Sequence, residues 1–115
     1  MLEDDPSVLK ATNRLLSSAG WKVEPFLDPI AFLRYAQEHR PEVAVIDILM
    51  PIMNGLEVQS RLRTLSPSTR LIVLTSNEDP TVRSTAMRSG AFAFFLKPAG
   101  KEEFLAEVQS AAIAA

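Results

Sequence analysis

Acidic, hydroxyl and amino side chains follow the apolar segments of this sequence at intervals that would bring them together in a folded sheet. They are Glu3 and Asp4 after residues 1–2, Asp47 after 43–46, Thr75 at the end of 70–75, and Lys97 after 91–96. Clustered acids repel one another unless a cation lies between them. Carboxylate oxygens suit Mg²⁺. Acids, a divalent ion, a lysine and a hydroxyl together are typical of a site that handles phosphoryl groups.

Asp47 carries the strongest signal in the sequence. The preceding run Val43-Ala44-Val45-Ile46 is typical of a strand that is buried on both faces of a parallel sheet. A carboxylate at such a position is costly unless something pairs with it, but the carboxyl ends of parallel strands are where ligands bind. We therefore interpret Asp47 as a functional residue. The alternative, a strand-end residue that caps the next turn, would leave the other acids unexplained.

Strand-like and helix-like segments alternate along the chain. The predicted strands are residues 1–2, 22–26, 43–47, 70–75 and 91–96; the predicted helices follow Asp5, Asp28, Asn54, Asp79 and Gly100. This alternation predicts βαβ units and a parallel sheet covered on both faces. We expect an α/β fold: a flavodoxin-like, doubly wound, five-stranded parallel sheet of order 2-1-3-4-5 with five helices in three layers. Residues 1–115 would form one domain, with a truncated first strand.

The composition excludes several classes of protein. The 115 residues contain no Cys, which excludes disulfides and thiolate metal sites. The net charge of −2 without a basic block predicts no direct nucleic acid binding. No apolar stretch approaches the ~20 residues of a membrane span, and no signal peptide is visible. A cytoplasmic location is the expectation.

Four motifs contain these residues: Glu3-Asp4-Asp5-Pro6-Ser7-Val8, Asp47-Ile48-Leu49-Met50-Pro51 with Asn54-Gly55, Leu74-Thr75-Ser76, and Lys97-Pro98. Together they resemble those of a receiver domain of a two-component response regulator, of the chemotaxis-regulator type. The resemblance covers essentially the whole chain apart from the short first strand. It implies a phosphorelay switch that accepts a phosphoryl group but has no independent enzymatic turnover.

The resemblance also implies a role for each matching residue. Asp47 would take the phosphoryl group from a sensor histidine kinase or a phosphotransfer protein and become an aspartyl phosphate. Mg²⁺ would be held by Glu3, Asp4, Asp47 and the backbone carbonyl of Leu49. Thr75 and Lys97 would bind phosphoryl oxygens, Phe94 would be a rotating aromatic switch, and the Lys97–Pro98 peptide bond would be cis. The fourth helix and fifth strand would offer a surface for a homodimer.

Three alternatives come from other classes of protein. A pseudo-receiver would bind a partner without phosphorylation, since a short first strand could misplace Glu3 and Asp4. A phosphatase with an aspartyl nucleophile would need a second Asp two residues after Asp47, where Leu49 stands. A nucleotide- or flavin-binding module would need a glycine-rich phosphate loop, but the chain has only four glycines and no such loop.

Overall fold

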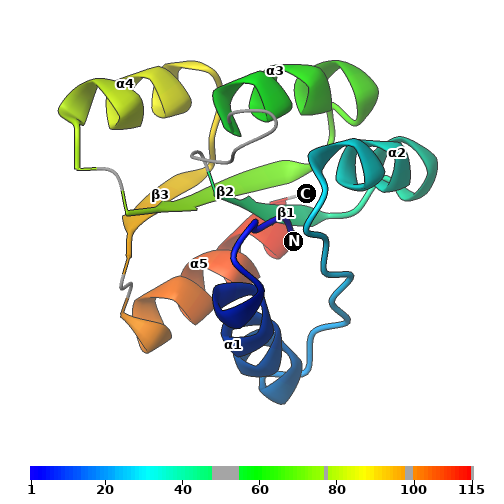
Figure 1. Ribbon diagram of the computed structural model, residues 1–115, viewed down its shortest axis with the longest axis vertical. Coiled ribbons are helices and arrows are strands. Elements are labelled where there is room, and N and C mark those ends of the chain that lie inside the picture. The colour runs from blue at the N-terminus through cyan, green and yellow to red at the C-terminus, as the bar shows by residue number, and fades with distance from the viewer. Residues whose placement is uncertain (48–54, 77, 98–99, 115) are drawn as a thin grey trace.

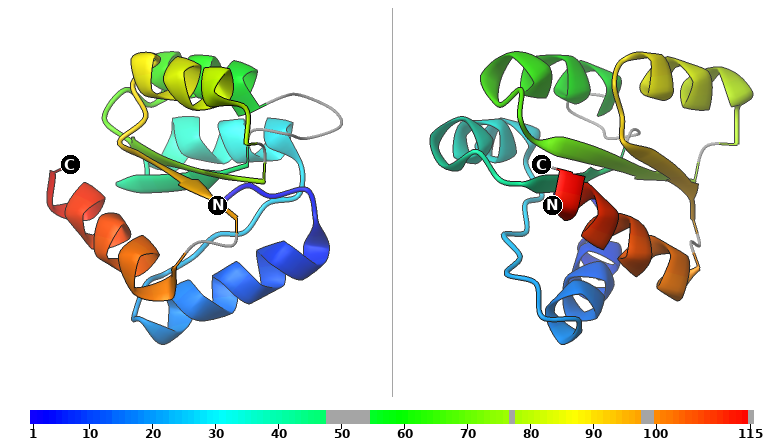
Figure 2. Two further views of the ribbon diagram at one scale, coloured as in Figure 1. Left: turned by 90° about the vertical axis from the view of Figure 1, so that its left-hand side faces the viewer. Right: turned by 180° about the vertical axis from the view of Figure 1, so that it is seen from behind.

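A parallel sheet lies between two layers of helices in the computed structural model, which describes residues 1–47, 55–76, 78–97 and 100–114. Helices α2, α3 and α4 cover one face, and α1 and α5 cover the other (Figure 1). The two further views show the same layers (Figure 2). The predicted α/β class is confirmed. No helix among the described residues is long and apolar enough to cross a membrane.

Three parallel strands form the regular part of the sheet. They are β1 (Val43–Ile46), β2 (Arg70–Thr75) and β3 (Ala93–Leu96), in the order β1-β2-β3. In this register Val45 lies opposite Ile72, which lies opposite Ala93. β2 is the most deeply buried, since every residue from Leu71 to Thr75 is buried. It supplies the apolar centre that both helix layers contact.

The start of the chain extends this sheet by a single residue. Leu2 forms parallel bridges to both Phe26 and Ile46. Its N–H donates to Val45 O at 2.8 Å, and its carbonyl accepts from Asp47 N at 3.1 Å. The order across the sheet is therefore the predicted 2-1-3-4-5, with the first two strands reduced to bridges. The predicted short strand over 22–26 is reduced to the single bridge at Phe26, because a neighbouring strand this short offers residues 22–25 almost nothing to pair with.

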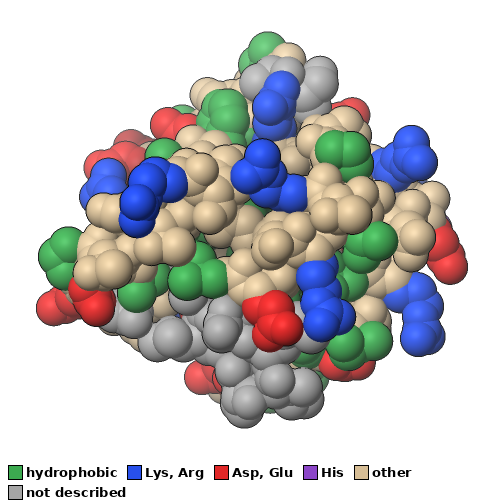
Figure 3. Space-filling view, turned by 90° about the horizontal axis from the view of Figure 1, so that it is seen from above, with side chains coloured by type: hydrophobic (Ala, Val, Ile, Leu, Met, Phe, Trp, Pro, Cys, Tyr) green, Lys and Arg blue, Asp and Glu red, His purple; other side chains and the backbone are tan. Residues whose placement is uncertain are grey.

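Five helices connect and cover the strands: α1 (Pro6–Ser18), α2 (Pro29–His39), α3 (Gly55–Leu65), α4 (Pro80–Arg88) and α5 (Lys101–Ala114). Three of them begin with Asp-Pro, and the predicted caps Asp5, Asp28 and Asp79 are confirmed. Each aspartate accepts a hydrogen bond from the N–H two residues later, at 2.9–3.2 Å. The proline that follows fits the first helical position, where its missing N–H costs nothing. Figure 3 looks down onto α3 and α4 and shows Lys and Arg side chains across the middle of that face.

The core has one cluster on each face of the sheet. Leu2, Phe32, Ile46, Val58, Leu62 and Val73 belong to the cluster under α2, α3 and α4. Leu16, Val45, Ile72, Phe104 and Val108 belong to the cluster over α1 and α5. Leu2 is only 1% exposed, so the residue that anchors the first strand is also a full member of the core.

We expect the substitution Leu2→Ala to lower the free energy of unfolding by about 2–5 kcal/mol, because it empties a buried site and loosens the bridge to both neighbours. Urea unfolding followed by circular dichroism measures this. Ile113→Ala is the control, since Ile113 is 76% exposed, and should change the value by less than about 0.5 kcal/mol. Equal effects of the two substitutions would contradict the anchoring role of Leu2.

Candidate functional site

The candidate residues meet at the carboxyl edge of the sheet. Asp47 follows β1, Thr75 ends β2, Lys97 follows β3, and Glu3 and Asp4 follow Leu2. Backbone hydrogen bonds fix these positions: Lys97 N donates to Thr75 O at 2.8 Å, and Glu3 N donates to Phe26 O at 3.1 Å. The sheet register therefore places side chains that lie far apart in the sequence at one edge.

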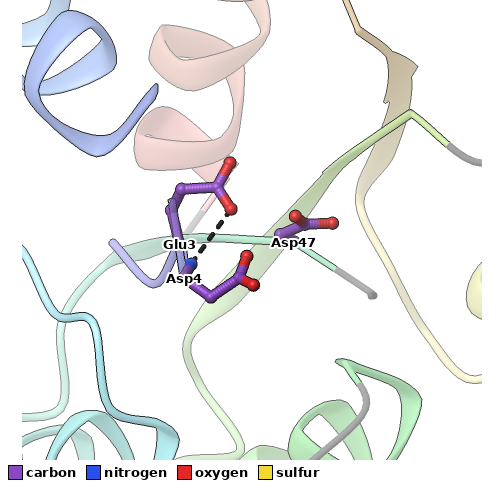
Figure 4. Close-up of side chains that lie close together, drawn as sticks. All are labelled: Glu3, Asp4 and Asp47. Atoms are coloured by element: carbon purple, nitrogen blue, oxygen red, sulfur yellow. Dashed lines mark hydrogen bonds between the residues drawn. The ribbon is translucent and has the colours of Figure 1, made fainter. Parts of the chain in front are cut away.

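Three carboxylates form the centre of the site. Glu3, Asp4 and Asp47 each place a carboxylate oxygen within 4.8 Å of the others. Figure 4 shows the three side chains coming from the segment after Leu2 and from the end of β1. Glu3 is 2% exposed and Asp47 is 8% exposed, whereas Asp4 is half-buried and lies toward solvent. The backbone N–H of Asp4 donates to Glu3 Oε2 at 3.0 Å, which orients the buried glutamate.

Lys97 supplies a cation within this cluster. Its ammonium group donates to Glu3 Oε1 and, at 3.3 Å, to Asp47 Oδ2. Its side chain is 20% exposed, so these ion pairs are largely shielded from solvent. Three carboxylates against one ammonium leave a surplus of two negative charges when all four groups are ionised. A divalent cation would neutralise that surplus.

The pKa values follow from burial and from this crowding. The pKa of Glu3 is raised from 4.5 to about 7; burial is the largest cause, the hydrogen bond with Asp47 acts in the same direction, and Lys97 opposes the rise. Burial alone would lower the pKa of Lys97, but the hydrogen bond to Glu3 and the charge of Asp47 outweigh it and raise that pKa above its usual value. Lys97 therefore stays charged, and Glu3 is the acid that holds a proton near neutral pH.

Thr75 and Phe94, the two other predicted site residues, lie in different surroundings. Thr75 is fully buried at the end of β2, opposite Leu96 in β3. Phe94 is half-buried and packs against the core cluster under α3 and α4, so it does not join the acids. The Arg83 guanidinium of α4 lies 5.8 Å from its ring centroid, a distance at which cation–π attraction operates.

Sequence reasoning missed two of these contacts. It predicted that Lys97 binds a phosphoryl oxygen, but it did not predict that the ammonium group pairs with Glu3 and Asp47. It gave Arg83 no individual role, and the spacing of residues on α4 carries no signal for a contact with β3. The predicted carbonyl of Leu49 and the Lys97–Pro98 peptide bond lie outside the described residues.

Known proteins resemble this chain in sequence over almost its whole length. The sequence profile described as "Response regulator receiver domain" matches residues 1–109. The response regulator protein TodT of Pseudomonas putida is 33% identical over 111 residues, which are 96% of this chain and 49% of TodT. The response regulator MprA of Mycobacterium leprae is 32% identical over 109 residues, 95% of this chain and 48% of MprA. The chain thus spans about half the length of the curated relatives it matches.

Solved structures show the same fold. The receiver domain of the putative response regulator NarL from Mycobacterium tuberculosis superposes with a TM-score of 0.89 at 28% identity, covering 99% of this chain and 94% of that one. A CheY-like receiver domain protein from Methanospirillum hungatei reaches a TM-score of 0.92 at 23% identity, covering 98% of this chain and 90% of that one. With the family profile over almost its whole length, this chain belongs to the response regulator receiver domains, the phosphoacceptor modules of two-component signal transduction.

Proposed function

We propose that Asp47 is the residue that accepts the phosphoryl group, and that residues 1–115 act as one receiver domain of this kind. The observation that supports this most directly is the meeting of Glu3, Asp4 and Asp47 within 4.8 Å at the end of β1. The donor would be the phosphohistidine of a sensor histidine kinase or a phosphotransfer protein in the cytoplasm. The domain would promote its own phosphorylation without further enzymatic turnover and without contacting nucleic acid.

The donor set fits Mg²⁺. Hard carboxylate oxygens are the ligands this ion prefers. When all four groups at the site are ionised, the surplus of two negative charges would be balanced by the two positive charges of one such ion. Glu3, Asp4 and Asp47 would hold it, together with the carbonyl of Leu49. When bound, the ion supplies positive charge beside the oxygens of the transferring phosphoryl group.

The residues of this chain would then have separate tasks. A carboxylate oxygen of Asp47 attacks the phosphorus, a P–O bond forms, and the P–N bond to the donor histidine breaks. The electron pair of that bond leaves with the imidazole. Lys97 turns from the acids to one phosphoryl oxygen, because its ammonium already lies 3.3 Å from Asp47 Oδ2. The hydroxyl of Thr75 approaches a second oxygen.

Phosphorylation would change the balance of contacts around the sheet edge. Lys97 and Thr75 gain the phosphoryl group as an anionic partner, so the contacts that they make in the unphosphorylated domain weaken. This favours a second arrangement of β3 and α4, in which Phe94 turns inward as Thr75 moves. The surface of α4 and β3 is our candidate for homodimer formation or partner docking.

The position of Glu3 argues against the pseudo-receiver alternative. That alternative depended on a short first strand misplacing Glu3 and Asp4. The backbone of Leu2 is hydrogen-bonded to Val45 and Asp47 on one side and bridges Phe26 on the other. Even a one-residue strand therefore supports the position of Glu3 and Asp4 beside Asp47.

The Asp47→Asn variant should take up no phosphoryl group from acetyl phosphate in the presence of Mg²⁺, because an amide is not a nucleophile for this transfer. Mass spectrometry of the intact protein measures the addition, which should be one phosphoryl group per wild-type chain. Asp79→Asn is the matched control, since Asp79 is an exposed helix cap and Asn also caps helices. Equal labelling of the Asp47→Asn variant would rule out Asp47 as the acceptor.

The Asp4→Asn variant should bind Mg²⁺ roughly tenfold or more weakly, because affinity follows the number of charged oxygen ligands. Isothermal titration calorimetry measures the dissociation constant. Asp5→Asn is a close control: Asp5 is adjacent in sequence and equally charged, but it caps α1. A similar loss of Mg²⁺ affinity in both variants would point to long-range attraction by the acidic residues as a group instead of direct ligation by Asp4.

Without divalent ions, the Glu3 carboxyl should titrate near pH 7, as measured by carbon-13 NMR in EDTA. Asp47→Asn should lower this midpoint, and Lys97→Met should raise it, because the two neighbours act in opposite directions. The folded protein holds this proton more tightly than the unfolded chain, so the group's contribution to stability is lost as pH rises from about 4.5 to about 7. A midpoint near 4.5 would show that burial does not control Glu3.

A further inference from the structure

Arg83 of α4 lies over the aromatic ring of Phe94 in β3. Its guanidinium carbon is 5.8 Å from the ring centroid, inside the ~6 Å range of cation–π attraction. Arg83 is exposed, whereas Phe94 is half-buried. The three ion pairs among the described residues do not include Arg83. The ring is therefore the partner that the fold gives to this cation.

The sheet register places Phe94 on the same face as Thr75. Phe94 lies opposite Val73 in β2, and Thr75 is two residues further along that strand. Side chains two residues apart in a strand point to the same face. This is the face that α4 covers (Figure 1), and Val73 belongs to the core cluster against which Phe94 packs. Thr75 is fully buried, and buried side chains are closely packed, so its neighbours on this face must take up any movement of its side chain.

We propose that Arg83 holds Phe94 in its outward position and thereby opposes the active arrangement of the domain. This inference rests on the proposed function, in which Phe94 turns inward as Thr75 moves to the phosphoryl group. The guanidinium contact belongs to the outward position, since a ring that turns into the core leaves the exposed side chain of Arg83 behind. Arg83 is thus a positioning residue, which acts on the phosphoryl site through Phe94.

The strength of this contact sets the size of the effect. A cation–π contact at an exposed site changes an equilibrium by about two- to fivefold. When the outward arrangement predominates, the affinity for a phosphoryl analogue is proportional to the fraction of molecules in the inward arrangement. Loss of the contact raises that fraction by the same factor. Removing Arg83 should therefore strengthen the binding of an anionic analogue, although it also removes a positive charge from the protein.

Calorimetric titration of the full chain with beryllofluoride, an analogue of the phosphoryl group, in saturating Mg²⁺ tests the proposal. Arg83→Gln should lower the dissociation constant about two- to fivefold. Arg88→Gln is the matched control, because Arg88 is exposed on the same helix and carries the same charge, but its Nε donates to Ser84 O. This control should not lower the dissociation constant, since loss of positive charge alone disfavours an anion.

A double-mutant cycle connects the effect to the ring. Phe94→Leu removes the aromatic face, and in that background Arg83→Gln should no longer lower the dissociation constant. NMR gives an independent measurement on the unaltered chain. The side-chain protons of Arg83 should resonate upfield because they lie near the ring face, and they should move downfield when beryllofluoride saturates the domain. These signals decide the result if Phe94→Leu does not fold, as judged by circular dichroism.

Several results would overturn the proposal. Arg83→Gln could bind beryllofluoride no more tightly than the wild-type chain, or Arg88→Gln could show an equal gain. The gain could persist undiminished in the Phe94→Leu background, or the Arg83 signals could stay in place at saturation. Each of these results leaves the phosphoryl site intact, because the wild-type chain still binds the analogue. A wild-type chain that binds no beryllofluoride would instead contradict the proposed function, and this inference with it.

Discussion

One ammonium group holds two buried carboxylates together at the carboxyl end of β1. Removing charges from water is costly, and only close pairing in good geometry offsets that cost. Lys97 meets this condition for Glu3 and Asp47, but it leaves the site with surplus negative charge. The rest of the architecture serves this arrangement, since the register of β1, β2 and β3 and the bridge at Leu2 place the four charged groups at one edge.

Local signals in the sequence predicted much of the fold. The Asp-Pro pairs marked the starts of α1, α2 and α4 because a cap and a first-turn proline act within a few residues. The apolar run before Asp47 is also a local signal, because consecutive apolar side chains predict a strand that is buried on both faces. The convergence of Glu3, Asp4, Asp47 and Lys97 followed from fold class, because parallel strands end at one edge.

Longer-range features could not be predicted in the same way. Residues 22–26 have strand-like composition, yet a strand exists only where a neighbour offers backbone partners, and Leu2 offers one bridge. The pairing of Lys97 with Glu3 joins the two ends of the chain, so no local pattern reports it. The contact of Arg83 with Phe94 likewise depends on how α4 packs against β3. Each is a consequence of tertiary packing.

Helix α3 connects the two ends of the molecule. It begins with the buried Gly55, on the chain segment that follows Asp47, and its middle carries Gln59 and Arg63, which hold the end of α4. α4 in turn carries Arg83, the neighbour of Phe94. Movements of α4 would therefore be felt both at the Phe94 ring in β3 and at Gln59 and Arg63 on α3.

Four consecutive residues near the start of the chain have four different environments. Leu2 is in the core, Glu3 is a buried acid, Asp4 lies at the rim, and Asp5 caps a helix. Only Glu3, Asp4 and Asp5 separate the bridge at Leu2 from the start of α1 at Pro6. Inserting or deleting one residue would give each side chain its neighbour's surroundings, for example a leucine in the place of the buried glutamate. Length variation in this segment should therefore be far less tolerated than in the segment 19–25, where no helix or strand fixes the number of residues.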